Sequence, residues 1–168
     1  MEFKTDRLWI KPFSPEDEAA LIQLMKDPKV GKTYMVPDFP DTEAEHAFFL
    51  RLQALSQDTS RFVSGIYLDT HLIGIVNETE VLEKSIELGY AIAAQYHNWG
   101  FATEMLQGAI AYLLEAGFSR VLCGAFESNA ASIRVMVKSG MCRLQQTDTV
   151  TYRGKEHRCI YYGIDKKS

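Results

Sequence analysis

Hydrophobic and polar positions follow two different periods along this chain, and the change between them separates strands from helices. After Ala102 the apolar residues recur at i, i+3, i+4 and i+7, on one face of a helix that we expect to stop at Gly117. The stretch at 85–93, directly before this helix, is typical of a strand. The nearly continuous apolar run at 120–126 is typical of a buried central strand.

Cap and turn residues place the remaining elements. Helices are expected after Ser14, where Pro15 takes the first helical position, at a capping box over 42–45, and after a cap at Ser128-Asn129. Further strands are expected at 3–13, 62–68, 72–76, 141–152 and 156–164, with a loop at 30–41. This order predicts a mixed α/β sheet of about seven strands covered by about four helices. The residues expected to face inward in two of the shorter helices are Ala20, Leu21, Leu24, Met25, Ile133, Met136 and Val137.

Length and composition narrow the class of protein. A chain of 168 residues, 46% hydrophobic and 24% charged, fits one folded domain, which we expect to span residues 1–168. No apolar run has the length of a membrane span and the N-terminus lacks a signal-peptide pattern, so we expect a cytoplasmic protein without a membrane partner. The net charge of −4 argues against a nucleic-acid partner. We expect a monomer or a homodimer.

The three cysteines are Cys123, Cys142 and Cys159, and they lack C-x-x-C spacing. This pattern indicates neither a disulfide framework nor a zinc site. Each cysteine lies in an apolar, strand-like context, so we expect buried free thiols with a raised pKa and no bound metal.

The turn between the strand at 85–93 and the long helix is the first candidate for a binding site. Asn98 and Gly100 stand in this turn, and the chain then enters the helix directly. The first N–H groups of a helix have no partners within it and its dipole is positive there, so the turn predicts an anion site, for phosphate in particular. The G-x-G-x-x-G pattern of a dinucleotide-binding fold is not found here.

The chain carries QYHNWGFATE at 95–104 and ESNAASIRVMVKSGM at 127–141. These two motifs, in this order, resemble the GNAT acetyltransferase superfamily, and the resemblance spans nearly the whole chain. The segments DRLWIKPF at 6–13 and ELGY at 87–90 are similar to two strands of the branch that acetylates ribosomal-protein N-termini at alanine or serine. The resemblance implies a mixed, mostly antiparallel twisted sheet flanked by helices, and acetyl-coenzyme A as the cosubstrate.

By this resemblance the turn holds the pyrophosphate of acetyl-coenzyme A. The family pattern Gln/Arg-x-x-Gly-x-Gly/Ala corresponds to Gln95, Asn98 and Gly100, so Asn98 replaces a glycine. Asparagine tolerates a left-handed backbone better than other non-glycine residues, and we therefore expect the turn to keep its shape. The resemblance also implies that the strand end at Ile92 and Ala94 pairs with the pantetheine arm, while Asn129 and Ser132 lie along the thioester. The full set expected to bind the cosubstrate is Ile92, Ala94, Gln95, His97, Asn98, Trp99, Gly100, Phe101, Ala102, Thr103, Asn129 and Ser132.

Acetyl transfer to an amine needs a base for the ammonium proton and assistance for the leaving thiolate. Glu87 is the first candidate base, and an exposed strand carboxylate is the alternative interpretation. Glu78 and Glu127 are further candidates, and His97 is a base by residue type. The tyrosine acid of the family corresponds to Met136, so that acid is missing and Ser132 becomes the candidate hydrogen-bond donor.

The sequence therefore predicts an acetyl-coenzyme A-dependent N-acetyltransferase that uses direct attack in a ternary complex. The expected acceptor is a protein N-terminal α-amine, and a small amine or polyamine is the alternative. A non-catalytic acyl-coenzyme A-binding or sensing domain is the alternative of another class. The acidic residues Glu78, Glu80, Glu83 and Glu87 fit a cationic amine or a solvated loop, while Tyr34, Met35, Phe39 and Tyr152 fit acceptor walls or core packing.

Overall fold

The strand predicted at 3–13 is two strands joined by a tight turn. In the computed structural model, which describes residues 1–167, β1 (Phe3–Lys4) and β2 (Leu8–Lys11) pair antiparallel. The Thr5 N–H donates to the Leu8 carbonyl, and the Leu8 N–H donates to Thr5 Oγ1 at 3.1 Å. The prediction of one continuous strand is wrong here, because alternation does not reveal a side chain that bonds back across a turn.

Two groups of residues form separate compact units. The N-terminal unit contains Met1–Asn77 and Tyr90–Phe101, and the C-terminal unit contains Glu78–Gly89 and the chain from Ala102 onward. Strands β4 (His71–Leu82) and β5 (Ser85–Ile92) contribute residues to both units. A single domain over residues 1–168 stays a prediction.

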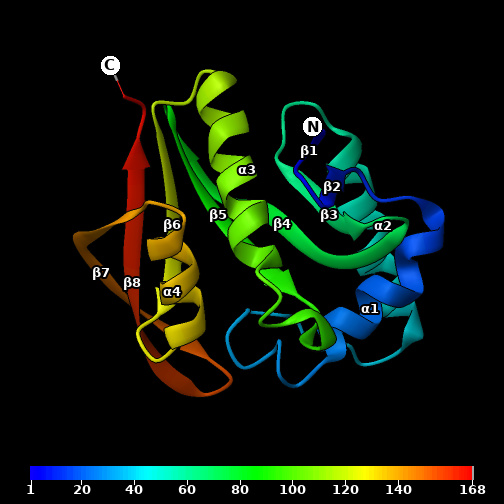
Figure 1. Cartoon of the computed structure of the whole chain (residues 1–168). Helices are drawn as coiled ribbons and strands as arrows, with labels where there is room; N and C mark the ends of the chain where they lie inside the picture. The colour runs from blue at the N-terminus through cyan, green and yellow to red at the C-terminus, as the bar shows by residue number, and fades with distance from the viewer. Residues whose placement is uncertain (168) are drawn as a thin grey trace. The chain divides into compact units, whose positions relative to one another are not determined.

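The strands form one eight-stranded sheet in the order β1-β2-β3-β4-β5-β6-β8-β7 (Figure 1). β5 pairs parallel with β6, whereas the pairs β1–β2, β2–β3, β3–β4, β6–β8 and β7–β8 are antiparallel. The remaining strands are β3 (Val63–Leu68), β6 (Arg120–Phe126), β7 (Cys142–Tyr152) and β8 (Lys155–Asp165). The mixed, mostly antiparallel sheet is therefore confirmed, with one strand more than predicted because the first strand is divided.

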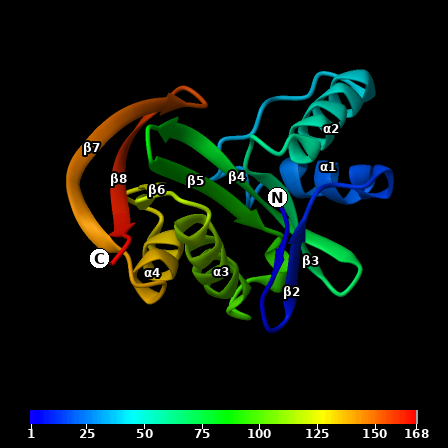
Figure 2. The same cartoon turned by 90° about the horizontal axis from the view of Figure 1, so that it is seen from above.

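Helices α1 (Glu18–Lys26) and α2 (Thr42–Gln57) lie side by side in the N-terminal unit (Figure 2). A 3-10 turn, Pro15–Asp17, precedes α1, and its Asp17 carboxylate accepts a hydrogen bond from the Ser14 N–H at 2.7 Å. The cap of α2 is Asp41, one residue before the predicted Thr42, because its carboxylate accepts from the Ala44 N–H at 2.8 Å. The two helices share one apolar core with strand residues, including Leu21, Leu24, Met25, Phe49, Val63 and Ile75.

In the C-terminal unit, α3 (Phe101–Glu115) from Ala102 onward lies beside α4 (Ala130–Lys138) in both views (Figures 1 and 2). Gln107 Nε2 donates to the Lys138 carbonyl at 3.2 Å. The predicted inward face of α3 is confirmed by the buried residues Met105, Leu106, Ala109, Ile110 and Leu113. β7 and β8 form a hairpin whose turn residues, Arg153 and Gly154, both have positive φ.

Some residues predicted to be buried are exposed. Ala20 and Val137 are exposed, and Ile22 is buried on α1 instead of Ala20. Cys142 is also exposed, because it lies on β7 at the edge of the sheet, where most side chains face solvent. Cys123 and Cys159 are buried as predicted, and burial raises the pKa of both thiols.

Candidate active site

The turn that follows β5 has the backbone shape expected of an anion-binding loop. The Ala93 N–H donates to the Ile73 carbonyl at 2.8 Å, and a short 3-10 turn, Ala94–Tyr96, follows. Asn98 has φ of 65° and Gly100 has φ of 84°, after which α3 begins at Phe101. The left-handed Asn98 confirms that asparagine adopts this conformation at the position where the family pattern has a glycine.

His97 closes this turn rather than pointing away from it. One ring nitrogen, Nε2, lies 2.8 Å from the Ile92 carbonyl oxygen, which makes the ring N–H the donor in that hydrogen bond. The contact engages the carbonyl at the strand end that the sequence assigned to the pantetheine arm. Ala94 is half-buried, and Gln95 lines a hollow of about 560 Å³ together with Ala20, Gln23 and Lys26 of α1.

Arg7, directly before β2, contacts the turn, and no pattern in the sequence predicts this contact. Its Nη1 donates to the Trp99 carbonyl at 3.2 Å, and its guanidinium lies 4.5 Å from the centre of the Phe101 ring. The Trp99 indole is 63% exposed and stacks on Phe101 with 6.1 Å between ring centres. The motif at 6–13 was a sign of family resemblance only, because Arg7 and Trp99 are far apart in the sequence.

Ala102, Thr103, Asn129 and Ser132 belong to the C-terminal unit. Ala102 and Thr103 lie in the first turn of α3 and are half-buried. Asn129 is the N-cap of α4, as predicted, and its Oδ1 accepts from the Ser132 N–H at 3.1 Å. The cap fixes the first turn of α4, on which Ser132 is half-buried. Met136, one turn later, is fully buried, so its side chain serves core packing.

Glu87 is half-buried on β5, so the interpretation as an exposed carboxylate is not supported. Burial is the largest cause that raises the pKa of this carboxyl, and the negative charges of Glu80 and Asp148 raise it further. A hydrogen bond with Thr79 acts in the opposite direction. A carboxyl with a raised pKa is a stronger base when ionised, which suits the role that the sequence assigned to Glu87.

Tyr161 and Asp148 are neighbours of Glu87 that sequence reasoning missed. A Cβ placed on Gly124 would lie 3.2 Å from Glu87 Oε1 and 2.9 Å from Tyr161 Cε1, so both side chains lie over this glycine. The Tyr161 hydroxyl hydrogen-bonds with Asp148, and burial is the largest cause that raises the tyrosine pKa. The signal that could have found these residues is the register Glu87↔Leu122 and Gly124↔Tyr161, which the sequence does not contain.

The other acidic candidates lie in different settings. Glu78 is half-buried on β4, and Glu80 and Glu83 are exposed. Glu127 is exposed and forms an ion pair with Arg158, with 3.9 Å between Oε2 and Nη1. Of these carboxylates, Glu80 is the one that contributes to the electrostatics of Glu87.

The aromatic residues proposed as acceptor walls take part in packing within their own units. The Tyr34 hydroxyl donates to Asn77 Oδ1 at 2.6 Å, and Phe39 packs edge-on against Phe48. Met35 is exposed. Tyr152 lies 6.2 Å from Phe126, between ring centres, beside His157, which stacks on the same phenylalanine.

Neither a metal-binding cluster nor a membrane-spanning helix is found among the described residues, 1–167. Among them, no group of three or more His, Cys, Asp or Glu side chains is arranged to hold a metal ion. In the same part of the chain, no helix combines the length and apolar character needed to cross a bilayer.

Comparison with known proteins gives a consistent result. Residues 7–142 match the family model described as the acetyltransferase (GNAT) domain. The chain is 28% identical over 142 residues to the uncharacterized N-acetyltransferase YoaA of Bacillus subtilis, a match that covers 82% of this chain and 80% of the relative. A GNAT-family acetyltransferase from Bacillus anthracis shares the fold with a TM-score of 0.83 at 23% identity, over 98% of each chain.

A ribosomal-protein acetyltransferase has the same fold. RimL, the ribosomal L7/L12 α-N-protein acetyltransferase solved in complex with coenzyme A, aligns with a TM-score of 0.83 at 16% identity, over 98% of each chain. This likeness shows that the chain and RimL share one fold. The chain belongs to the GNAT family and is an N-acetyltransferase of that class.

Proposed function

We propose that this protein transfers the acetyl group of acetyl-coenzyme A to a primary amine, and that the preferred acceptor is a protein N-terminal α-amine. The observation that carries this proposal is the turn at Asn98 and Gly100, left-handed at both residues and continuous with the start of α3. That shape, at the start of a long helix, suits a pyrophosphate. RimL, which has the same fold, was solved with coenzyme A.

The residues of the turn fit this cosubstrate. The backbone N–H groups from Asn98 to Thr103 are the proposed donors to the pyrophosphate, helped by the helix dipole. Ile92, Ala94, Gln95 and His97 form the strand end and turn beside them. In the C-terminal unit, Asn129 and Ser132 are the proposed residues along the thioester arm.

Glu87 is the proposed base. An α-ammonium with a pKa of about 8 is mostly protonated at neutral pH and must lose a proton before its nitrogen can attack. In the proposed step the Glu87 carboxylate accepts this proton, directly or through a water, and the neutral amine attacks the thioester carbonyl carbon. The new C–N bond forms, the C–S bond breaks, and a second proton from the nitrogen passes to the leaving sulfur to give the free thiol, while Glu87 releases the first proton to solvent.

Ser132 is the proposed donor to the leaving sulfur. The family's tyrosine position is occupied by the buried Met136, which has no proton to give. A thiol with a pKa of about 8.5 leaves with modest help, so one hydroxyl hydrogen bond is sufficient. The Asn129 cap orients the turn of α4 that carries Ser132.

The proposed acceptor class rests on the resemblance and on charge. The carboxylates of Glu87 and Asp148, with Glu80, give the neighbourhood of the proposed base a negative charge that suits an ammonium group. RimL acts on the ribosomal protein L7/L12, as its name states. For this chain we propose a protein N-terminus in the cytoplasm as the acceptor, and a polyamine as the second candidate because of the same negative charge.

Acceptor-dependent release of thiol tests the proposal. Acetyl-coenzyme A is mixed with the protein and a panel of peptides with free N-termini, the same peptides with blocked N-termini, and polyamines. We expect release with the free peptides and not with the blocked ones. Thiol release with polyamines alone would show that a polyamine, and not a protein N-terminus, is the acceptor. Tight binding of acetyl-coenzyme A with no thiol release for any amine would identify an acyl-coenzyme A sensor.

A further inference from the structure

Arg7 and the turn before α3 form a contact that neither the family motifs nor the proposed chemistry explains. The guanidinium donates to the Trp99 carbonyl and at the same time packs over the Phe101 ring. Its Nη2 atom lies 3.5 Å from the point where a Cβ of Gly100 would stand. One exposed side chain from the beginning of the chain thus contacts Trp99 and Phe101, the residues on either side of Gly100.

The hydrogen bond from Arg7 also affects the direction of the Gly100 N–H, through the peptide group that joins Trp99 and Gly100. The Trp99 carbonyl and the Gly100 N–H belong to the same planar peptide, which is trans. In a trans peptide the C=O and N–H bonds point in opposite directions. When Arg7 holds the carbonyl on its own side, the Gly100 N–H is therefore directed to the other side.

We propose that Arg7 is a positioning residue for the anion-binding turn, since it holds the Trp99–Gly100 peptide so that the Gly100 N–H faces the pyrophosphate of the cosubstrate. This inference rests on the proposed use of acetyl-coenzyme A and assigns a task to a residue outside the turn itself. Gly100 has positive φ and Asn98 precedes it in the same conformation, so this peptide needs an external partner to hold it in one orientation.

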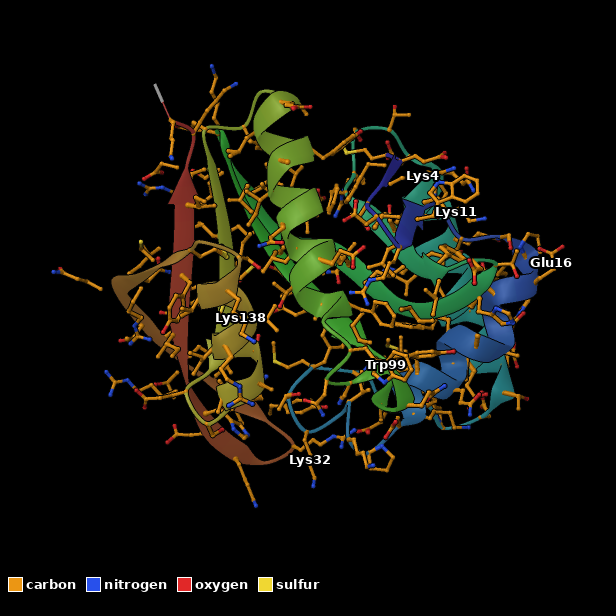
Figure 3. The ribbon with its side chains drawn as sticks, viewed as in Figure 1. Lys4, Lys11, Glu16, Lys32, Trp99 and Lys138 are labelled. Carbon is orange, nitrogen blue, oxygen red and sulfur yellow. The ribbon has the colours of Figure 1, made fainter. Side chains whose placement is uncertain are left out.

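Arginine suits this task better than lysine. A planar guanidinium can stack on Phe101 and donate in its own plane to the carbonyl, whereas an ammonium group makes only a point contact. Lys4 and Lys11 offer a comparison in the same unit, because both contact the ring of Trp9 on β2, at 4.3 Å and 4.6 Å from its centre. Figure 3 labels these two lysines together with Trp99.

The test compares Arg7→Gln, Arg7→Lys and the matched control Lys11→Gln, which removes a cation with an aromatic contact away from the turn. Calorimetry measures the Kd of coenzyme A, and steady-state kinetics separate KM for acetyl-coenzyme A from kcat. We expect Arg7→Gln to raise both the Kd and this KM about tenfold, the usual scale for one charge-assisted hydrogen bond, with kcat changed by less than about twofold. Arg7→Lys should recover part of the affinity, and Lys11→Gln should match the wild type.

A spectroscopic measurement on the wild type does not depend on any variant folding. In amide proton–nitrogen spectra, the Gly100 signal should shift when coenzyme A is added. A folded Arg7→Gln protein with wild-type Kd, or a wild-type Gly100 amide that is insensitive to coenzyme A, would overturn the inference while acetyl-coenzyme A use stands. If the wild type itself binds no coenzyme A, the proposed function and this inference both fail.

Discussion

Glu87 and Tyr161, from strands that are not neighbours in the sheet, approach each other over the bare backbone of Gly124. A Cβ at that position would lie 3.2 Å from Glu87 Oε1 and 2.9 Å from Tyr161 Cε1, which is closer than normal contact for the tyrosine. The glycine therefore leaves the space in which the proposed base and its tyrosine neighbour both fit.

Gly124→Ala should displace one of these two side chains. We expect a free energy of unfolding lowered by about 1–3 kcal/mol, and a lower kcat with the Kd of coenzyme A unchanged. Thermal unfolding and steady-state kinetics measure the two effects. Gly163→Ala is the matched control, because its Cβ would meet the flexible side chains of Leu122 and Leu144 rather than Glu87. An equal loss of kcat in both variants would mean that the effect is general to the sheet.

Glu87→Gln should remove the proposed base while keeping the shape of the side chain. We expect kcat to fall by roughly 100-fold or more, with the Kd of coenzyme A little changed. The loss should be smaller at high pH, where more of the amine is already neutral. The outcome that contradicts the assignment is a variant with wild-type kcat at neutral pH.

The charge of Asp148 should shift the acidic limb of the pH–rate profile. Activity requires ionised Glu87, so the rate falls as the pH drops through the raised pKa of this carboxyl. Asp148→Asn removes a negative neighbour and should lower that pKa, which moves the acidic limb to lower pH. Glu156→Gln removes an exposed carboxylate from β8 and should leave the limb in place. An acidic limb at the same pH in Asp148→Asn and in the wild type would show that Asp148 does not affect the pKa of the proposed base.

The same carboxyl should also give stability a pH dependence. Because the Glu87 pKa is raised in the folded state, folding is favoured while the group is protonated. The contribution of Glu87 to the free energy of unfolding is fully present below its pKa in the unfolded chain, about 4.3. It is lost as the pH rises through the pKa of this carboxyl in the folded protein. Denaturant unfolding at several pH values should show this decline in the wild type and a smaller one in Glu87→Gln. Equal slopes in the two proteins would contradict it.

Asn98 should tolerate glycine and reject a β-branched residue. Its φ of 65° costs little for glycine and much for valine, so Asn98→Gly should keep the affinity for coenzyme A and Asn98→Val should weaken it. Asp69 provides the control, since it has φ of 54° in the β3–β4 turn of the same unit. Asp69→Val should lower stability without changing the Kd. Equal Kd values for Asn98→Gly, Asn98→Val and Asp69→Val would exclude the turn from coenzyme A binding.

The elements of this fold could be predicted from local patterns. The expected periods are found in helix α3, strand β6 and the tail hairpin. They were predictable because the spacing of apolar residues shows which face of an element is buried. The errors in the element boundaries occur where one polar contact decides the outcome. Thr5 divides the first strand, and Asp41 replaces Thr42 as the cap of α2.

The candidate site was only partly predictable for a different reason. The turn at Asn98 and the cap at Asn129 are local, and both were found. The contacts of Arg7 with Trp99 and of Glu87 with Tyr161 depend on which strand pairs with which and in what register. Periodicity carries no information about register between distant segments, so these partners became known only from the structure.

The N-terminal unit is discontinuous in the chain, since it needs Tyr90–Phe101 in addition to Met1–Asn77. During synthesis, the Ile73 carbonyl can accept its hydrogen bond only after Ala93 has been made, and Arg7 can donate to the Trp99 carbonyl only after Trp99 has been made. A nascent chain that has reached Asn77 therefore contains β1, β2, β3, α1 and α2 but lacks Tyr90–Phe101. The turn proposed to bind the cosubstrate belongs to this second segment, so the N-terminal unit cannot be complete before Phe101 has been made, although it contains the first residues of the chain.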